Sequence, residues 1–280
     1  MMSEQRHPPR RRVVDTSHGS IAAELRGERG LPVLFIHGNS FCRAVFDAQL
    51  QSSLAADHRL VAIDLPGHGE SSNAADPMRS YTLPAFAEVA VEVLERLDMA
   101  EAVVVGWSLG GHIGIEMLAR LPSIRGLMII GAPPIPVNGW AQGFVQTPNS
   151  ALAAQREWSD EDVDAFLMKV FGRLPDAGLR EAARRADGRF RQRIFQAARE
   201  GAGVDQKVTV ETHSVPLAVV NGADDRLVKL DYFDTVAYAN LWEGRCHRLH
   251  GLGHAPFWEA PTTFAPLLAR FLRDCADRSS

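Results

Sequence analysis

The stretch "GWSLGGH" (residues 106–112) follows directly on the apolar run of residues 102–105. Its third residue, Ser108, stands in the pattern G-x-S-x-G, which at the junction of a buried strand and a helix presents the serine hydroxyl on a sharp turn above the sheet. The residues after it begin a helix, so free N–H groups and the positive end of the helix dipole lie near that hydroxyl. The stretch predicts a strand, turn and helix that carry a nucleophilic serine. The alternative is a glycine-rich turn with an incidental serine.

Apolar runs rich in branched residues recur along the chain with amphipathic segments between them, among them residues 83–100, where apolar positions repeat at helical spacing. This alternation predicts parallel strands connected by helices, and the near-continuous apolar character of the runs implies burial on both faces. An early pair of runs, around residues 12–15 and 21–26 with a turn at Gly19 and Ser20, predicts an antiparallel hairpin at the sheet edge. The clearest later runs are residues 33–36, 60–63, 102–105, 127–130 and 217–220.

The alternation stops after residue 130 and resumes at "PLAVVNG" (residues 216–222). The intervening part holds helical, charged segments such as residues 160–171 and 179–199. We therefore expect a core domain made of residues 1–133 and 215–280. A helical cap, residues 134–214, is expected to be inserted after the sixth strand.

Bulk properties exclude several classes of protein. The 280-residue chain has a net charge of -4, which gives no overall basic surface of the kind that nucleic acids attract. No apolar run approaches the roughly 18 residues that a membrane span needs. The three cysteines are widely scattered and form no C-x-x-C pair, which favours free thiols in a cytoplasmic protein. The ligand motifs H-x-H-x-D-H and H-E-x-x-H do not occur, so we expect neither a metal nor another cofactor.

A serine is a poor nucleophile until a base takes its proton and a third group fixes that base, so the hypothesis requires an acid and a histidine. The stretch "VVNGADDRLV" (residues 219–228) follows a strand with Asp224 and Asp225, and "LHGLGHAPFWEAP" (residues 249–261) carries two histidines. Serine, then aspartate, then histidine is the chain order of α/β hydrolases.

Five motifs together resemble the α/β-hydrolase family: "FIHGNS", "DLPGHGESS", "GWSLGG", "NGADDRLV" and "GHAPFWEAP". Within that family, "GWSLGGHIGIEMLAR", "RGLMIIGAPP" and "NLWEG" resemble the metal-independent N-acylhomoserine lactonases, which are quorum-quenching enzymes. The likeness runs from about residue 31 to the C-terminus and is weakest in the expected cap. It implies an α/β fold with a mostly parallel central sheet flanked by helices.

The resemblance also implies a catalytic triad of Ser108 as nucleophile, Asp225 as orienting acid and His254 as base. Asp225 is preferred to Asp224 because the family pattern G-x-x-D places the acid three residues after a glycine, here Gly222. The lactonases that the chain resembles have glutamate as the acid, whereas this chain has the shorter aspartate. His254 fits the family's G-H pattern, and His250 is the competing candidate.

An oxyanion hole needs two N–H donors aimed at the oxygen on which charge develops. The backbone of Leu109 would supply one and that of Asn39, after "HG", the other. The Asn39 side chain is a candidate for substrate binding or, alternatively, for capping the turn. Phe166 is a candidate for binding the acyl chain or, equally, for packing in the core of the cap. The histidines of the family motifs are expected to hold loops together; they are His37, His68 and His112.

The function that follows is a serine hydrolase that opens the lactone ring of N-acylhomoserine lactones. The triad by itself indicates only acyl transfer, since the fold supports many reactions. The alternatives are a carboxylesterase or carbon–carbon bond hydrolase with the same triad, and a non-catalytic small-molecule receptor. Each takes a small molecule as partner, and the oligomeric state stays undetermined.

Overall fold

One eight-stranded sheet runs through the computed structural model, which describes residues 9–146 and 148–277. The strand order is β1-β2-β4-β3-β5-β6-β7-β8. β2 pairs antiparallel with β1 and with β4, and every pair from β4 to β8 is parallel. The strands are β1 (Arg10–Thr16), β2 (Gly19–Arg26), β3 (Pro32–Ile36), β4 (Arg59–Ile63), β5 (Val103–Trp107), β6 (Gly126–Ile130), β7 (Leu217–Gly222) and β8 (His247–Leu249). The predicted fold class, a mostly parallel sheet flanked by helices, is confirmed.

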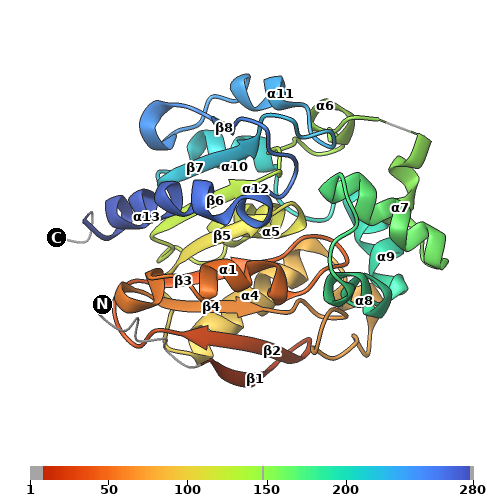
Figure 1. Cartoon of the computed structure of the whole chain (residues 1–280), viewed down its shortest axis with the longest axis horizontal. Helices are drawn as coiled ribbons and strands as arrows, with labels where there is room; N and C mark the ends of the chain where they lie inside the picture. Colours follow the sequence, from red (N-terminus) through yellow and green to blue (C-terminus); the bar gives the residue numbers. More distant parts are fainter. Residues whose placement is uncertain (1–8, 147, 278–280) are drawn as a thin grey trace.

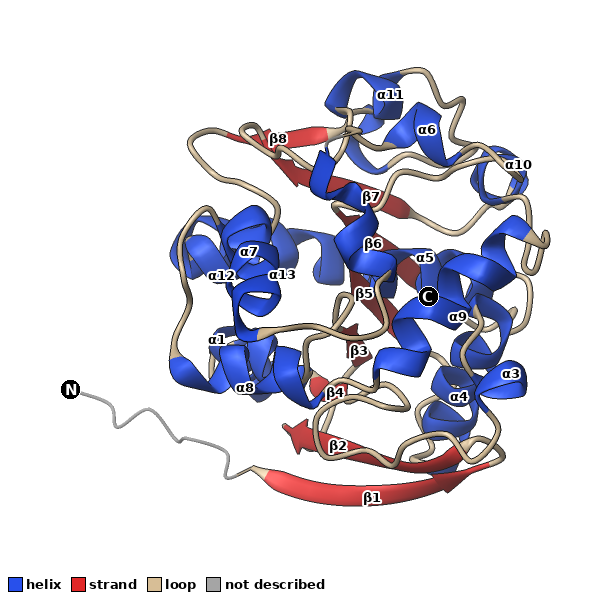
Figure 2. Ribbon diagram, turned by 90° about the vertical axis from the view of Figure 1, so that its right-hand side faces the viewer, coloured by secondary structure: helices blue, strands red, loops and turns tan. Residues whose placement is uncertain are grey.

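Helices cover both faces of the sheet, as the end-on view in Figure 2 shows. Helices α4 (Leu83–Arg96) and α5 (Leu109–Leu118) lie on one face, and α13 (Pro261–Asp277) lies on the other. Every residue of β3, β5 and β6 is buried, because both faces of these strands contact helices. The shorter helices of this core are η1 (Arg43–Phe46), α1 (Asp47–Leu50), α2 (Leu54–Asp57), α3 (Pro77–Ser80), α11 (Leu230–Asp234), η3 (Trp242–Gly244) and α12 (Pro256–Glu259).

The predicted hairpin at the sheet edge is present, but its turn lies two residues earlier than expected. Thr16 pairs with Gly19, so Ser17 and His18 form the turn and Gly19 is already the first residue of β2. Gly19 has a φ of +119°, a conformation that closes the turn and that glycine adopts readily. The predicted helix over residues 83–100 ends at residue 96, and Asp98 reverses the chain in the left-handed region at φ 54°.

The segment between β6 and β7 is helical, as predicted, with α7, α8 and α9 lying together beyond one end of the strands (Figure 1). The expected helix over residues 179–199 is two helices, because the side chain of Asp187 accepts a hydrogen bond from the N–H of Arg189 and starts a new helix there. The last helix of the segment packs against α5 in the core. The helices are α6 (Trp140–Gly143), η2 (Pro148–Ala154), α7 (Asp160–Phe171), α8 (Ala177–Arg185), α9 (Gly188–Arg199) and α10 (Gln206–Thr212).

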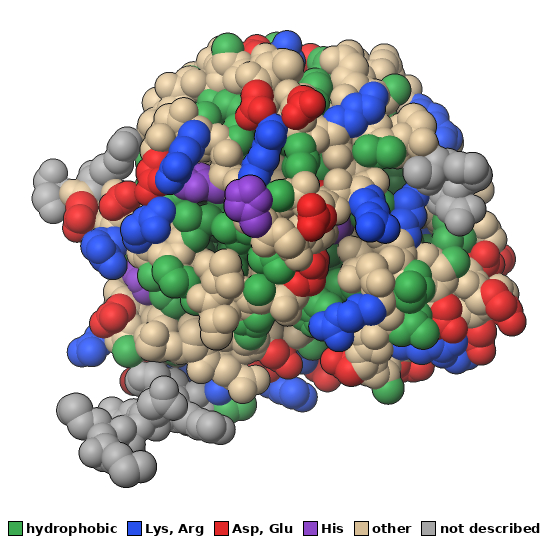
Figure 3. Space-filling model, turned by 45° about the horizontal axis from the view of Figure 1, so that its top comes forward, with side chains coloured by type: hydrophobic (Ala, Val, Ile, Leu, Met, Phe, Trp, Pro, Cys, Tyr) green, Lys and Arg blue, Asp and Glu red, His purple; other side chains and the backbone are tan. Residues whose placement is uncertain are grey.

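The surface carries charged side chains of both signs. Acidic and basic side chains of the described residues are interspersed over the face shown in Figure 3. Among the described residues, none of the helices combines the length and the apolar character that crossing a membrane requires.

Two glycines allow α5 to cross very close to the strands beside it. A Cβ atom at Gly106 would lie 2.2 Å from the carbonyl oxygen of Gly110, and one at Gly110 would lie 2.0 Å from the carbonyl oxygen of Ile36. Both obstacles are backbone atoms, which cannot rotate away. The first residue of α5 is therefore held against the ends of β5 and β3.

We predict that Gly110→Ala destabilises the protein, because the added methyl group forces α5 away from β3. The expected loss in free energy of unfolding exceeds about 1 kcal/mol, so the melting temperature falls by more than roughly 2–4 °C. Gly178→Ala is the matched control: it lies on the exposed side of α8, where alanine is favoured over glycine by up to about 1 kcal/mol. Calorimetry on both variants checks this, and equal melting temperatures would contradict the close crossing.

Candidate active site

Ser108 stands at the turn between β5 and α5 with φ 52° and ψ -115°, a conformation that costs a residue with a side chain free energy. Its N–H donates to the carbonyl oxygen of Ile130 at 2.7 Å, and its carbonyl oxygen accepts from the N–H groups of Gly111 and His112. The backbone is thereby fixed on both sides of the turn. Strain of this kind, maintained by the surrounding structure, is typical of functional positions.

His254 and Asp225 form a buried pair at the ends of two neighbouring strands. Asp225 follows β7 and His254 follows β8, and Nδ1 of the imidazole lies 2.7 Å from Oδ2 of the carboxylate. The other carboxylate oxygen, Oδ1, accepts from the N–H groups of Leu227 at 2.8 Å and Val228 at 3.3 Å. Both oxygens of Asp225 are therefore occupied, and the plane of the carboxylate is set by its own loop.

The competing candidates, Asp224 and His250, both lie exposed at the surface. Asp224 contributes its backbone N–H to the carbonyl oxygen of Leu252 at 2.9 Å, which is a structural contact. The structure thus brings Asp225 and His254 together, whereas Asp224 and His250 lie at the surface.

The loop that carries His254 is fixed from two directions. The carboxylate of Glu259 accepts from the N–H groups of Gly253 at 2.7 Å and Ala255 at 3.0 Å, one on each side of the histidine. The indole of Trp107 donates to the carbonyl oxygen of His254 at 2.8 Å. The contact made by Trp107 was not predicted, although the place of this residue beside Ser108 in the motif was a signal.

Leu109 and Asn39, the expected oxyanion-hole residues, both line the same cavity as Ser108 and His254. Leu109 is the first residue of α5, so its N–H has no carbonyl group one turn earlier in the helix to bond. The side chain of Asn39 donates to the carbonyl oxygen of Ala153 at 3.1 Å and accepts from the hydroxyl of Ser40 at 2.8 Å. These bonds hold the turn, which supports the structural alternative for this side chain.

The cavity has a volume of about 650 Å³ and is walled mainly by apolar side chains from the segment between β6 and β7. Phe166 of α7 lines it and also packs against Phe41 and Trp158, with ring centroids 5.7 Å and 4.8 Å away. Phe166 therefore belongs to the packing of this segment and also lines the cavity, and its binding of an acyl chain stays a prediction. A pocket of this size and character suits a small apolar ligand with a few polar groups.

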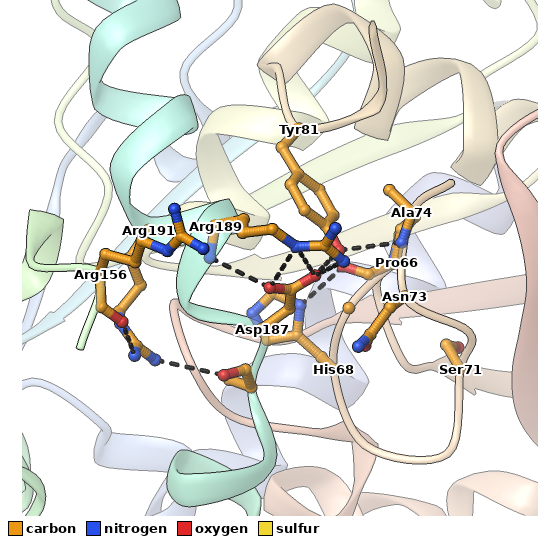
Figure 4. Close-up of polar contacts among 12 residues, drawn as sticks. Pro66, His68, Ser71, Asn73, Ala74, Tyr81, Arg156, Asp187, Arg189 and Arg191 are labelled. Atoms are coloured by element: carbon orange, nitrogen blue, oxygen red, sulfur yellow. Dashed lines mark hydrogen bonds and ion pairs between the residues drawn. The ribbon is translucent and has the colours of Figure 1, made fainter. Parts of the chain in front are cut away.

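Asp187, between α8 and α9, joins the segment to the loop that follows β4 (Figure 4). Its carboxylate accepts from the hydroxyl of Tyr81 at 2.6 Å and pairs with Arg189 at 2.7 Å, and its N–H donates to the carbonyl oxygen of Gly67 at 2.8 Å. Burial alone would raise the pKa of Asp187, but the hydrogen bonds from Arg189 and Tyr81 lower it below its ordinary value. The charged carboxylate therefore anchors the start of α9, a helix that lines the cavity.

Arg191, labelled in the same view, links that segment to the turn that carries Asn39. The buried guanidinium donates to the carbonyl oxygens of Gln155 at 2.8 Å and Arg156 at 2.7 Å, and reaches the hydroxyl of Ser40 at 3.4 Å. Burial lowers the pKa of Arg191 to about 10, so it stays charged at neutral pH. Sequence reasoning missed this residue, because an arginine in a charged helix is expected to face solvent.

His37 and His68 hold loops together, as predicted. Burial lowers the pKa of each below its ordinary value, so both are neutral and their Nε2 atoms accept hydrogen bonds. That of His37 accepts from the N–H of Leu65 at 3.0 Å, and that of His68 accepts from the N–H of Ser40 at 3.3 Å. Over residues 9–146 and 148–277, no three His, Cys, Asp or Glu side chains gather as a metal site would require.

Known proteins that are similar to this chain include a lactonase, an esterase and an acetyltransferase component. A crystal structure of the N-acyl homoserine lactonase AidH in complex with N-butanoyl homoserine is 45% identical, with a TM-score of 0.92 over 95% of this chain and 97% of that chain. A pimeloyl-[acyl-carrier protein] methyl ester esterase of Stenotrophomonas maltophilia is 30% identical over 87% of this chain and 93% of its own length. The acetyltransferase component of an acetoin cleaving system from Pseudomonas putida is 34% identical over 47% of this chain, which spans only 36% of that protein.

The model of the alpha/beta hydrolase family matches residues 33–267, which include the serine turn, the aspartate loop and the histidine loop. Fold, motif order and family match agree over most of the chain, and the protein belongs to the alpha/beta hydrolase family.

Proposed function

We propose that the protein is a serine hydrolase that opens the lactone ring of N-acylhomoserine lactones, with a triad of Ser108, Asp225 and His254. The observation that carries this proposal is the buried contact of 2.7 Å between His254 and Asp225, beside a cavity that Ser108 also lines. The likeness to AidH, at 45% identity and over nearly the whole chain, supports the choice of substrate.

The proposed reaction follows from the placement of these groups. Because Nδ1 of His254 faces Asp225, its Nε2 is the nitrogen that takes the proton of Ser108. The serine oxygen attacks the lactone carbonyl carbon, and the backbone N–H groups of Asn39 and Leu109 stabilise the oxyanion. The bond between the carbonyl carbon and the ring oxygen then breaks, and His254 gives its proton to the leaving oxygen, which stays tethered to the acyl-enzyme as a hydroxyl. The neutral His254 then activates a water molecule, whose attack releases the N-acylhomoserine and returns the proton to Ser108. No step requires a metal ion, and opening the ring would remove a quorum-sensing signal.

We also propose that residues 134–214 act as a cap over the cavity. Support comes from Phe166 of α7 and Ile194 of α9, two helices of this segment that both line the cavity. Their apolar side chains would bury the acyl chain.

A carboxylesterase is the second candidate, and the same triad would serve it. The methyl ester esterase of S. maltophilia, 30% identical over most of both chains, favours this alternative. No observation favours a carbon–carbon bond hydrolase. A receptor has no need of a fixed acid beside a histidine, so the pair of Asp225 and His254 argues against it.

We predict that the purified protein converts N-hexanoyl-homoserine lactone to a product heavier by one water. Mass spectrometry distinguishes this from amide hydrolysis, which releases hexanoic acid. Ser108→Ala should lower the rate by several orders of magnitude, because the members of a triad act as a unit. Brisk hydrolysis of p-nitrophenyl esters with every acylhomoserine lactone left unopened would make the protein an esterase.

Asp225→Asn and Asp224→Asn form a matched pair, one buried against His254 and one exposed on the same loop. We predict that Asp225→Asn lowers kcat by several orders of magnitude, because an amide does not stabilise the imidazolium and allows the wrong tautomer. Asp224→Asn should stay within a few-fold of the wild type. The measurement is steady-state hydrolysis of a p-nitrophenyl ester, and the reverse ranking would move the acid to Asp224.

The apolar cavity predicts a preference for longer acyl chains. Each buried methylene contributes about 0.8 kcal/mol, so kcat/KM for the N-hexanoyl lactone should exceed that for the N-butanoyl lactone by about 15-fold. Phe166→Ala removes a ring from the wall and should reduce this ratio, whereas Met168→Ala, an exposed position on the same helix, should leave it unchanged. An unchanged ratio in Phe166→Ala would assign the ring to packing alone.

A further inference from the structure

His112 lies on the first turn of α5, four residues after Ser108, and only 3% of its surface is exposed. Its backbone N–H donates to the carbonyl oxygen of Ser108 at 3.2 Å, and its side chain contributes to the wall of the cavity. We expected His112 to hold loops together, but its ring instead joins two helices, α5 and α10, through Gln206.

The contacts of Gln206 fix which nitrogen of His112 carries the proton. The amide oxygen of Gln206 lies 2.7 Å from Nδ1 of His112, and the amide nitrogen donates to the carbonyl oxygen of His112 at 3.4 Å. Because the amide oxygen can only accept, Nδ1 must carry a hydrogen and donate it. Burial lowers the pKa of His112 to about 4, so the ring is neutral and its Nε2 is an acceptor with no hydrogen of its own.

That acceptor has no partner. Nε2 of His112 is buried without any hydrogen bond to the described residues, which is unusual because buried polar atoms are nearly always paired. The rings of Trp140 and Phe144 pack against the imidazole in tilted arrangements, at centroid distances of 5.5 Å and 5.8 Å, and both residues also line the cavity. For the buried Nε2 to contact a ligand in the cavity, a neighbouring ring has to move, and Trp140 is partly exposed.

The chemistry of the proposed substrate supplies the missing partner. An N-acylhomoserine lactone has one hydrogen-bond donor, its amide N–H, and its remaining polar atoms are acceptors. The groups proposed to act on the lactone are donors: the hydroxyl of Ser108 and the N–H groups of Asn39 and Leu109. The amide nitrogen is bonded to the carbon next to the lactone carbonyl. In the proposed attack by Ser108, the N–H would therefore lie close to Ser108 and to the turn of α5 that carries His112.

We propose that Nε2 of His112 accepts the amide N–H of the substrate, and that this bond makes the site selective for amide-bearing lactones over simple esters. The inference rests on the proposed function and adds a specificity residue to it. A substrate that lacks the N–H leaves the acceptor unpaired in the complex, which is the situation that allows a site to reject a close analogue strongly.

Two substitutions separate the two nitrogens of the ring. His112→Asn places an amide nitrogen where Nδ1 was and so can keep the bond to Gln206, but it removes the acceptor at Nε2. His112→Gln can place its amide oxygen where Nε2 was, and so keeps an acceptor there while losing the contact made by Nδ1. Thermal unfolding of both variants establishes that each is folded.

The experiment compares two lactones on the wild type and on both variants: N-hexanoyl-homoserine lactone, and the ketone analogue in which a methylene group replaces the amide N–H. We expect the wild type to favour the amide in kcat/KM by about tenfold or more, His112→Asn to reduce the ratio to near one, and His112→Gln to retain most of it. A ratio near one in the wild type, or an unchanged ratio in folded His112→Asn, overturns the inference while leaving the proposed function intact. A wild type that opens neither lactone overturns the proposed function, and the inference falls with it.

Discussion

The contact between the backbones of Gly110 and Ile36 is the constraint on which the site depends. Ile36 is the last residue of β3 and Gly110 is the second residue of α5, and their approach leaves no room for a Cβ atom. Because Asn39 follows β3 by three residues and Leu109 directly precedes Gly110, this contact sets the spacing between the two proposed oxyanion donors. It also forces the chain into the strained turn at Ser108, since a helix so close to the sheet can be entered only by a sharp reversal.

The other half of the site is tied to this turn by hydrogen bonds rather than by close packing. The N–H of Ser108 bonds the end of β6, and the N–H of Gly131, the next residue after that strand, donates to the side chain of Asn221 in β7 at 2.8 Å. The indole of Trp107 completes the connection by holding the carbonyl oxygen of His254. The serine turn and the histidine loop, almost 150 residues apart in the sequence, are thus linked through buried polar contacts that each satisfy a backbone group.

How far sequence predicts this molecule depends on the range of the interaction involved. The parallel strands were recognisable because strands that are buried on both faces consist of continuous apolar runs. Ser108, Asp225 and His254 were recognisable because each stands in a short motif whose neighbouring residues identify it. Contacts between remote side chains leave no such pattern. The pairs of His112 with Gln206 and of Arg191 with Ser40 join positions 94 and 151 residues apart. The break at Asp187 was missed for a related reason, because helical periodicity continues on both sides of the aspartate that caps α9.

The wall of the cavity and the proposed catalytic acid share one piece of backbone. Leu227 and Val228 donate their N–H groups to Asp225, while the carbonyl oxygen of Leu227 accepts from the N–H of Val145 at 2.9 Å and Val228 forms a bridge with Phe144. Both Phe144 and Val145 line the cavity. A displacement of this wall by a bulky ligand would therefore move the donors that orient the carboxylate.

The link between the cavity wall and the loop of Asp225 also constrains the length of the acidic side chain at this position. A glutamate at residue 225 would require the loop to withdraw from His254 by about one methylene group, and the wall at Phe144 would have to withdraw with it. The aspartate thus sets the loop, and through it the cavity wall, closer to the histidine. Pocket shape and acid identity are then parts of one constraint, and a change in either requires a matching change in the other.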